Sequence, residues 1–230
     1  MTILTEFKQV LVFAAHPDDE VIGCGGTLRK LADLGAVITV VIATSGDTGV
    51  SPAFLHLENI PETRQLESKK TKELLGIDRM IFLGHQTQQL ANDQLTFHQC
   101  IRLVRQLRPD LVLTHHPNDK HRDHRVLADL TREAVWKAWE NVMPDLGERH
   151  RVTETWLYEI TDTFATPDIV IDIGASLKTK LAAMAVHVSQ QEVMAGIAHY
   201  LKGLAQVRGF MLECEYGEAF QTCNILPRMG

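Results

Sequence analysis

The sequence has 230 residues, which at roughly 150 residues per domain fits one large domain, or one domain with an appendage. Its 23 Lys and Arg against 29 Asp and Glu give a formal net charge of −6, which argues against the basic surface that nucleic acids and anionic membranes require. With 45% hydrophobic and 23% charged residues, the composition excludes an intrinsically disordered chain.

The cysteines and the apolar stretches indicate the compartment. The sequence contains four widely spaced cysteines, Cys24, Cys100, Cys214 and Cys223. A disulfide framework would be denser, so we interpret them as free thiols in a reducing compartment. The N-terminal residues do not have the pattern of a signal peptide, and the longest apolar stretch, at 36–43, is too short to span a bilayer. We therefore expect a soluble, cytoplasmic protein with no membrane partner.

Strands and helices are expected to alternate through the first part of the chain. Short β-branched runs predict strands, and apolar residues at helical spacing predict helices. In chain order we expect a strand at 10–15, a helix at 24–34, a strand at 36–43, a helix at 58–75, a strand at 79–83, a helix at 95–107, a strand at 110–114 and a helix at 124–141. Continuous apolar strands between helices indicate an α/β fold, with a mostly parallel sheet covered by helices on both faces.

The last eighty residues have a less regular pattern. Strands are expected near 155–160 and 168–171, helical stretches from 176 to about 206, and a closing strand near 218–224. No stretch resembles a domain linker. We therefore expect a single Rossmann-like domain over 1–230, with a core at about 1–145 and a C-terminal helical and strand extension at about 150–230.

Two polar motifs each follow an expected strand directly. The first is His16-Pro17-Asp18-Asp19-Glu20, and the second is the segment 115–124, which holds four of the 11 histidines. Even scattering would place fewer than one histidine in ten residues. In a doubly wound sheet, ligands bind at the carboxyl ends of the strands. If the two strands are parallel, both motifs lie at that edge.

These residue types favour a metal-dependent hydrolase. In a turn, His16 and Asp19 are close enough to point at one ion, while Asp18 beside Asp19 places two carboxylates together, which is costly without a cation or a shared proton. Two histidines and one carboxylate with an open position for water is an arrangement used by catalytic zinc. A nearby unligated carboxylate supplies a general base, and a histidine can stabilise an oxyanion. These parts suit cleavage of an amide or ester, and the residues alone do not name the substrate.

Three rival functions were weighed. A non-haem iron oxygenase uses similar ligands, but it predicts an all-β barrel. A metal-dependent phosphoesterase with two metals about 3.5–4 Å apart would need further bridging carboxylates, for which Asp47 and Asp119 are the obvious spares. A non-catalytic nucleotide- or sugar-binding protein is suggested by Gly23-x-Gly25-Gly26, which is weak evidence by itself. The phosphoesterase and the binding protein remain open as alternatives.

The two motifs and their placement resemble the PIG-L/LmbE-like family of zinc-dependent N-acetylglucosaminyl deacetylases. Ala15-His16-Pro17-Asp18-Asp19-Glu20 and His121-Arg122-Asp123-His124 are the most specific features. Further similar segments occur in order along the chain: Gly25-Gly26-Thr27, Thr44-Ser45-Gly46-Asp47, Arg64-x-x-Glu67, Lys180, His187-x-Ser189-Gln190 and Glu218-Ala219-Phe220. The resemblance implies a single deacetylase domain that removes an N-acetyl group from an amino sugar or its conjugate, releasing acetate and a free amine.

The resemblance also implies a cofactor and its ligands. His16, Asp19 and His124 would ligate one Zn²⁺ per chain, or another divalent transition metal in its place. Asp18 would be the general base that activates the attacking water.

Three further residues receive roles from the resemblance. His121, held by Asp123, would stabilise the tetrahedral oxyanion, and Arg64 would bind the substrate. The chain departs from many relatives in the loop 85–94, where His85-Gln86-Thr87 follows Gly84, so the acyl acceptor is expected to be unusual. The identity of that acceptor, the role of His187 and the presence of a homo-oligomer stay open.

Overall fold

The computed structural model describes residues 3–50, 53 and 59–226. Its strands are β1 (Gln9–Ala14), β2 (Val37–Thr44), β3 (Arg79–His85), β4 (Leu111–His115), β5 (Glu154–Tyr158), β6 (Ile169–Asp172) and β7 (Gly217–Thr222). Its α-helices are α1 (Asp19–Asp33), α2 (Ile60–Leu75), α3 (Gln94–Leu107), α4 (Arg122–Trp139), α5 (Leu177–Ala185) and α6 (Ile197–Phe210). Short 3₁₀ helices are η1 (Ile3–Glu6), η3 (Pro144–Leu146) and η4 (Val188–Gln190). Glu58, where we expected the second helix to begin, lies outside the described residues.

The strands form one sheet in the order β3-β2-β1-β4-β5-β7-β6. The first five are parallel to their neighbours, and β7 runs antiparallel to both β5 and β6. The chain crosses from β3 over to β4 at the far side of β1, so the switch point of this sheet lies between β1 and β4. This arrangement confirms the expected α/β class with a mostly parallel sheet.

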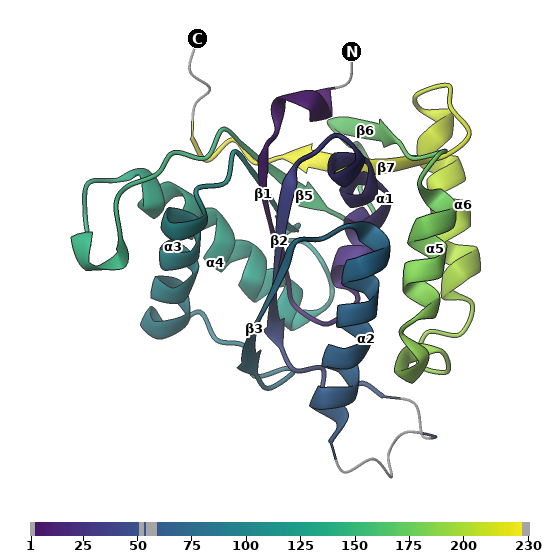
Figure 1. Ribbon diagram of the computed structural model, residues 1–230, viewed down its shortest axis with the longest axis horizontal. Helices are drawn as coiled ribbons and strands as arrows, with labels where there is room; N and C mark the ends of the chain where they lie inside the picture. The colour runs from purple at the N-terminus through teal and green to yellow at the C-terminus, as the bar shows by residue number, and fades with distance from the viewer. Residues whose placement is uncertain (1–2, 51–52, 54–58, 227–230) are drawn as a thin grey trace.

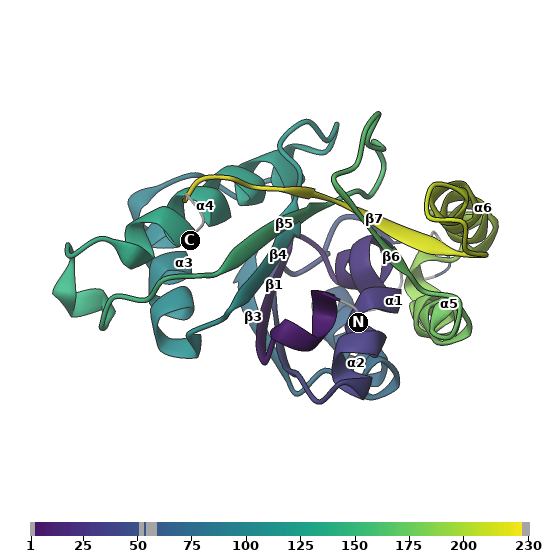
Figure 2. The ribbon, with the colours of Figure 1, turned by 90° about the horizontal axis from the view of Figure 1, so that it is seen from above.

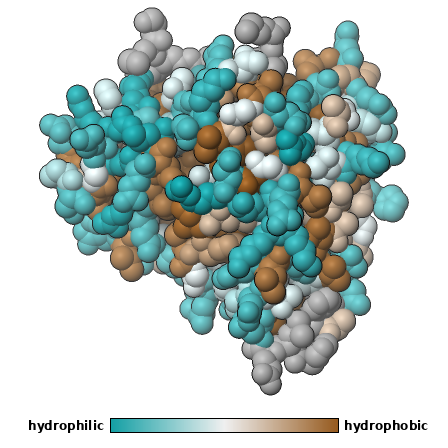
Figure 3. Space-filling view, viewed as in Figure 1, coloured by the Kyte–Doolittle hydropathy of each residue, from teal (hydrophilic) through white to brown (hydrophobic). Residues whose placement is uncertain are grey.

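Helices cover both faces of the sheet (Figures 1 and 2). Along β1, Val10, Val12 and Ala14 point into a core shared with α1, α5 and α6. Leu11 and Phe13 of β1, with Ala15 just after it, belong to a second core shared with α3 and α4. Because successive side chains of a strand face opposite sides, one short apolar run contributes to both cores. Apolar side chains also reach the surface between hydrophilic ones near the middle of one face (Figure 3).

Helix α1 begins five residues earlier than we expected, at Asp19 rather than at Cys24. Gly23, which precedes the expected start, lies inside the helix together with Gly25 and Gly26. A Cβ atom on Gly23 would lie 2.3 Å from the Tyr158 ring, and one on Gly26 would lie 2.9 Å from Ile173. Close packing of α1 therefore explains these glycines, and the first turn of the helix carries part of the first motif.

The C-terminal residues pack against α1 and add two strands to the sheet. The expected closing strand is β7, which lies between β5 and β6 rather than at the edge. Met184 of α5 and Leu201 of α6 are buried in the core. Within the described part of the chain, the helices are too short or too polar for any of them to cross a membrane.

Candidate functional site

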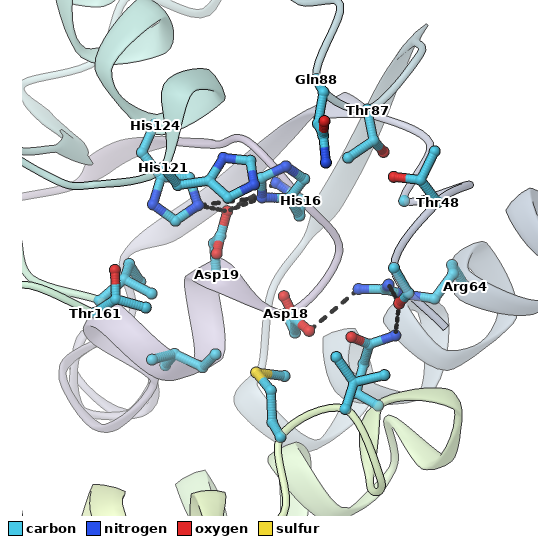
Figure 4. Close-up of a pocket in the computed structure, with 17 residues that line it drawn as sticks. His16, Asp18, Asp19, Thr48, Arg64, Thr87, Gln88, His121, His124 and Thr161 are labelled. Carbon is cyan, nitrogen blue, oxygen red and sulfur yellow. Dashed lines mark hydrogen bonds and ion pairs between the residues drawn. The ribbon is translucent and has the colours of Figure 1, made fainter. Parts of the chain in front are cut away.

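The two sequence motifs meet at one edge of the sheet. β1 and β4 are parallel neighbours, with Val10 opposite Leu111, so the residues that follow the two strands lie side by side. A pocket of about 240 Å³ opens there (Figure 4). Of the seven expected site residues, six line this pocket: His16, Asp18, Asp19, Arg64, His121 and His124. The seventh, Asp123, is buried behind His16.

Three donor atoms form a compact triangle at the floor of the pocket. His16 Nδ1 lies 3.1 Å from His124 Nε2 and 3.3 Å from Asp19 Oδ2, and the last two atoms are 3.4 Å apart. Ligands bound tetrahedrally to zinc at ~2.0–2.1 Å lie about 3.3 Å from one another. The spacing of the three atoms therefore fits a single metal ion of this kind.

Two carboxylates stand behind the histidines of this triangle. The Asp123 carboxylate lies 3.0 Å from His16 Nε2, and the Asp119 carboxylate lies 3.1 Å from His124 Nδ1. A carboxylate on the far nitrogen of a metal-binding histidine keeps the proton there and leaves the near nitrogen free to bind. Both rings are therefore held with the nitrogen that can bind a metal facing the same point.

Asp123 contacts a different histidine from the one we expected. Its carboxylate accepts hydrogen bonds from the His16 ring at 3.0 Å and from the Gln88 backbone N–H at 2.7 Å. Only its own backbone N–H reaches His121, donating to Nδ1 at 3.2 Å. His121 is the N-cap of α4, so capping brings these two residues together, while the carboxylate orients His16.

The site stabilises positive charge. Burial raises the pKa of the Asp19 carboxyl, but the three neighbouring imidazoles of His124, His115 and His16 outweigh it and hold that pKa well below its usual range. Burial lowers the pKa of His124, but the Asp19 and Asp119 carboxylates raise it to about 10. A cluster of ionised carboxylates that favours a proton at this point also favours a divalent cation there.

Asp18 and Arg64 form a buried ion pair beside the triangle. The Arg64 guanidinium donates to the Asp18 carboxylate at 3.1 Å, and it also donates to the carbonyls of Pro17 and Gly49. Burial raises the pKa of Asp18 to about 7, and Arg64 opposes that rise. Asp18 has a φ of 124°, an uncommon conformation for a residue other than glycine that is often found at functional sites. One of its carboxylate oxygens faces Arg64 (Figure 4).

His121 lies over the triangle as a neutral imidazole. Burial lowers its pKa, and the neighbouring rings of His16 and His124 lower it further. Because Nδ1 accepts the Asp123 N–H, the ring proton belongs on Nε2. The side chain therefore offers a hydrogen-bond donor to the pocket.

Sequence reasoning missed the roles of Asp119 and His115. We considered Asp119 only as a ligand for a second metal, but it contacts His124. His115 is fully buried; its Nε2 accepts the Ala15 N–H at 3.0 Å, and its ring stacks on His124 at 4.1 Å. Burial lowers the pKa of His115 to about 4. The pairing of motif carboxylates with ligand histidines is the signal that could have identified Asp119.

Two overlapping groups of side chains in the described chain could hold a metal ion, His16 with His121 and His124, and Asp19 with His115 and His124. The Ala15 N–H already uses His115 Nε2. His16, Asp19 and His124 each belong to at least one of these groups, and their donor atoms lie 3.1–3.4 Å from one another.

Asp47 and Asp119, the carboxylates that a two-metal phosphoesterase would need as bridges, make other contacts in the structure. Asp47 accepts hydrogen bonds from Ser45 Oγ at 2.8 Å and from the Thr87 backbone N–H at 2.9 Å. Asp119 accepts from Thr161 Oγ1 at 3.1 Å and faces His124. Neither carboxylate is placed to bridge a second metal ion.

Two other features of the sequence are placed by the structure. In the loop 85–94, Thr87 and Gln88 line the pocket. His187 is buried outside the pocket, with its Nε2 3.1 Å from Thr71 Oγ1. It connects α5 to α2 and does not face the triangle of donor atoms.

Comparisons with known proteins bear on the reaction. The family model described as PIG-L, GlcNAc-PI de-N-acetylase, matches residues 11–135. A probable N-acetyl-alpha-D-glucosaminyl L-malate deacetylase 2 of Bacillus cereus is 30% identical over 198 residues, which cover 84% of this chain and 88% of that protein. The residues matched by the family model include both motifs of the pocket.

Solved structures resemble this one over almost the whole chain. The N,N'-diacetylchitobiose deacetylase of Pyrococcus horikoshii, solved with an inhibitor, has a TM-score of 0.87 and 27% identity, covering 96% of this chain and 86% of that one. The 4-carboxy-2-hydroxymuconate hydratase of Pseudomonas putida KT2440 has a TM-score of 0.85 and 23% identity, covering 97% and 98%. The second similarity shows the fold alone, so the reaction must be argued from the side chains of the site.

Proposed function

We propose, since this chain belongs to the PIG-L family of GlcNAc-PI de-N-acetylases, that its pocket removes the N-acetyl group of an amino-sugar conjugate by metal-assisted hydrolysis. The family resemblance expected from the motifs is thereby confirmed. The chain is an N-deacetylase of N-acetylglucosamine-containing small molecules. The metal, the role of each residue and the substrate class are our proposal.

His16, Asp19 and His124 would hold one zinc ion. The observation that carries this assignment is the triangle of donor atoms 3.1–3.4 Å apart, with carboxylates behind both rings. When bound, the ion supplies a Lewis acid that polarises the acetamide carbonyl and acidifies the attacking water.

Asp18 is the general base of this reaction. It lies next to a ligand in the chain, its carboxylate faces the pocket, and its contact with Arg64 favours the ionised form that can accept a proton. Asp18 takes one proton from the attacking water, and the same proton passes to the leaving nitrogen as the C–N bond breaks. The products are acetate and a free amine.

His121 stabilises the charge that develops on the acetamide oxygen. Its ring has a lowered pKa and is a neutral donor, and its Nε2–H can donate a hydrogen bond to the oxyanion. Donors fixed in place before the reaction are worth roughly 10²–10³ in kcat each. Arg64, held by Asp18 and two carbonyls, keeps the base ionised and presents its remaining edge to substrate hydroxyls.

An acetate-release assay tests the function. The purified protein, loaded with zinc, is incubated with a panel of N-acetylglucosamine conjugates that includes methyl N-acetylglucosaminide, N,N'-diacetylchitobiose and an inositol conjugate. Acetate and a new primary amine should form in equal amounts with at least one of them. If none of the panel releases acetate while the protein binds zinc, the assignment as a deacetylase of these sugars is wrong.

A further inference from the structure

A second chamber of about 300 Å³ adjoins the pocket. Four residues line both spaces, Ile22, Ile160, Thr161 and Met194. Because the two spaces share these walls, a molecule that reacts at the donor triangle can extend into the chamber.

The walls of the chamber are largely apolar. Ile22 comes from α1 and Ile160 follows β5, while Ile197 and Tyr200 come from α6. The Tyr200 hydroxyl donates to the Ile160 carbonyl at 2.7 Å, which satisfies both polar groups. The aromatic ring is thereby left as an apolar wall of the chamber.

The chamber offers little attraction to an anion. Among the described residues that line it, the one charged side chain is Lys120. Its Nζ lies 3.7 Å from the Asp162 carboxylate, and the side chain is 67% exposed. An exposed, already paired ammonium adds little binding energy for a second carboxylate.

Thr161, one of the residues that line the chamber, lies across the donor triangle from Arg64 and Thr48. Arg64 and Thr48 lie to one side of His16 and Asp19, and Thr161 lies to the other side (Figure 4). In a 2-acetamido sugar, the carbon that carries the acetamide stands between C1, which carries the conjugated group, and C3, which carries a hydroxyl. With the acetamide at the triangle, these two positions diverge to opposite sides.

We propose that the chamber binds the group attached to C1 of the sugar and that this group is neutral and apolar, such as an aromatic ring. The inference rests on the proposed deacetylase function and specifies its substrate class. The sugar hydroxyls face Arg64 and Thr48, and the apolar group packs against Ile160, Ile197 and Tyr200. By contrast, the relative from Bacillus cereus is described as acting on a malate conjugate, in which the attached group is anionic.

The test compares glycosides that differ only at C1. Deacetylation is measured for the methyl, phenyl and carboxymethyl glycosides of N-acetylglucosamine with the same anomeric configuration. Burying a phenyl ring in the chamber should raise kcat/KM roughly tenfold to hundredfold over the methyl glycoside. The carboxymethyl glycoside should gain nothing over methyl.

A pair of variants locates the effect in the chamber. Ile197→Asn places an amide on the chamber wall and should lower the ratio of phenyl to methyl kcat/KM toward one. Val207→Asn is the matched control, because Val207 is an exposed residue of the same helix and does not line the chamber in the described structure. The control should keep the wild-type ratio.

Three outcomes would overturn the proposal. These are equal kcat/KM for phenyl and methyl glycosides, a carboxymethyl glycoside that exceeds phenyl, and an N-butyryl methyl glycoside that gains as much as phenyl, which would assign the chamber to the acyl group. Binding of the phenyl and methyl glycosides to the zinc-loaded Asp18→Asn variant is also measured by calorimetry. This experiment tests the chamber without depending on turnover. Equal Kd values there reject the chamber assignment, whereas a lack of acetate release by the wild-type protein rejects the deacetylase function.

Discussion

Asp18 and Asp19 are neighbours in the chain, but they face different surroundings. Asp19 lies against three imidazoles, which hold its pKa far below the usual range. Asp18 pairs with Arg64 and has a pKa raised by burial to about 7. One carboxylate is therefore suited to bind a cation and the other to exchange a proton.

Substitution of each aspartate by asparagine should separate these roles. Asp18→Asn should keep bound zinc and lose about 10²–10⁴ in kcat, because it removes the base and no ligand. Asp19→Asn should lower zinc affinity as well as activity. Metal content by elemental analysis and kcat by acetate release measure both. If Asp18→Asn loses its zinc instead, the roles of the two aspartates must be exchanged.

An Asp123 variant tests the contact between Asp123 and His16, which the sequence could not reveal. Its carboxylate orients His16, which precedes it by 107 residues, so Asp123→Asn should weaken zinc binding by about 10–100-fold. Asp129→Asn, on the exposed side of the same helix, should leave zinc binding unchanged. Competition with a chromophoric chelator measures both variants. An Asp123→Asn protein with wild-type zinc affinity and reduced kcat would favour the role at His121 that the motif first suggested.

Helix α1 depends on two residues from the end of the chain. The Glu218 carboxylate accepts the backbone N–H groups of Gly26 and Thr27 at 2.8 and 2.7 Å. Lys180 pairs with Glu218 at 2.6 Å and donates to the Ile22 carbonyl at 2.8 Å. A buried ion pair thus binds the backbone of α1, the helix whose first turn carries Asp19.

Removal of one member of the buried Lys180–Glu218 pair should destabilise the folded protein. Lys180→Met leaves the Glu218 carboxylate buried without its cation, and we expect a loss of about 3–5 kcal/mol in the free energy of unfolding. Lys137→Met is the control: Lys137 also pairs with a glutamate, but at a partly exposed position, and its loss should cost less than ~1 kcal/mol. Chemical denaturation measures both. Equal losses would show that the buried pair has no special role in stability.

The elements that the sequence predicted well are those whose signals are local. β-branched runs such as 36–43 and the histidine motifs each lie within ten residues, so their spacing can be recognised without the fold. The start of α1 was placed five residues too late, and the close approach of Gly23 to Tyr158 and of Gly26 to Ile173 depends on residues distant in sequence. The position of β7 inside the sheet, like the partner of Asp123, depends on residues distant in sequence.

At the scale of the whole molecule, His187 should make stability sensitive to acid. Burial lowers its pKa to about 3, and Arg64 contributes to the shift. Below about pH 6.5 the unfolded chain binds a proton here that the folded chain does not bind until about pH 3. This difference favours unfolding, so stability should fall as the pH drops through that window, by up to about 1.4 kcal/mol per pH unit.

A histidine variant isolates this contribution from that of the carboxylates. His187→Gln should reduce the difference in Tm between pH 7.5 and pH 5 relative to the wild-type protein. His199→Gln changes an exposed histidine and should leave that difference unchanged. Thermal unfolding followed by circular dichroism provides the comparison. An unchanged pH dependence in His187→Gln would mean that His187 does not remain neutral in the folded protein.

The two motifs are separated by about a hundred residues in the chain. The switch point of the sheet brings them together at one triangle of donor atoms. The most direct test of this account is to titrate zinc into metal-free protein while acetate release is measured. Activity should be absent at the start, rise in proportion to added zinc and stop rising at one ion per chain, and His124→Ala should stay inactive throughout. Full activity in the metal-free protein, or a rise that continues to two ions per chain, would contradict a single-metal site made of His16, Asp19 and His124.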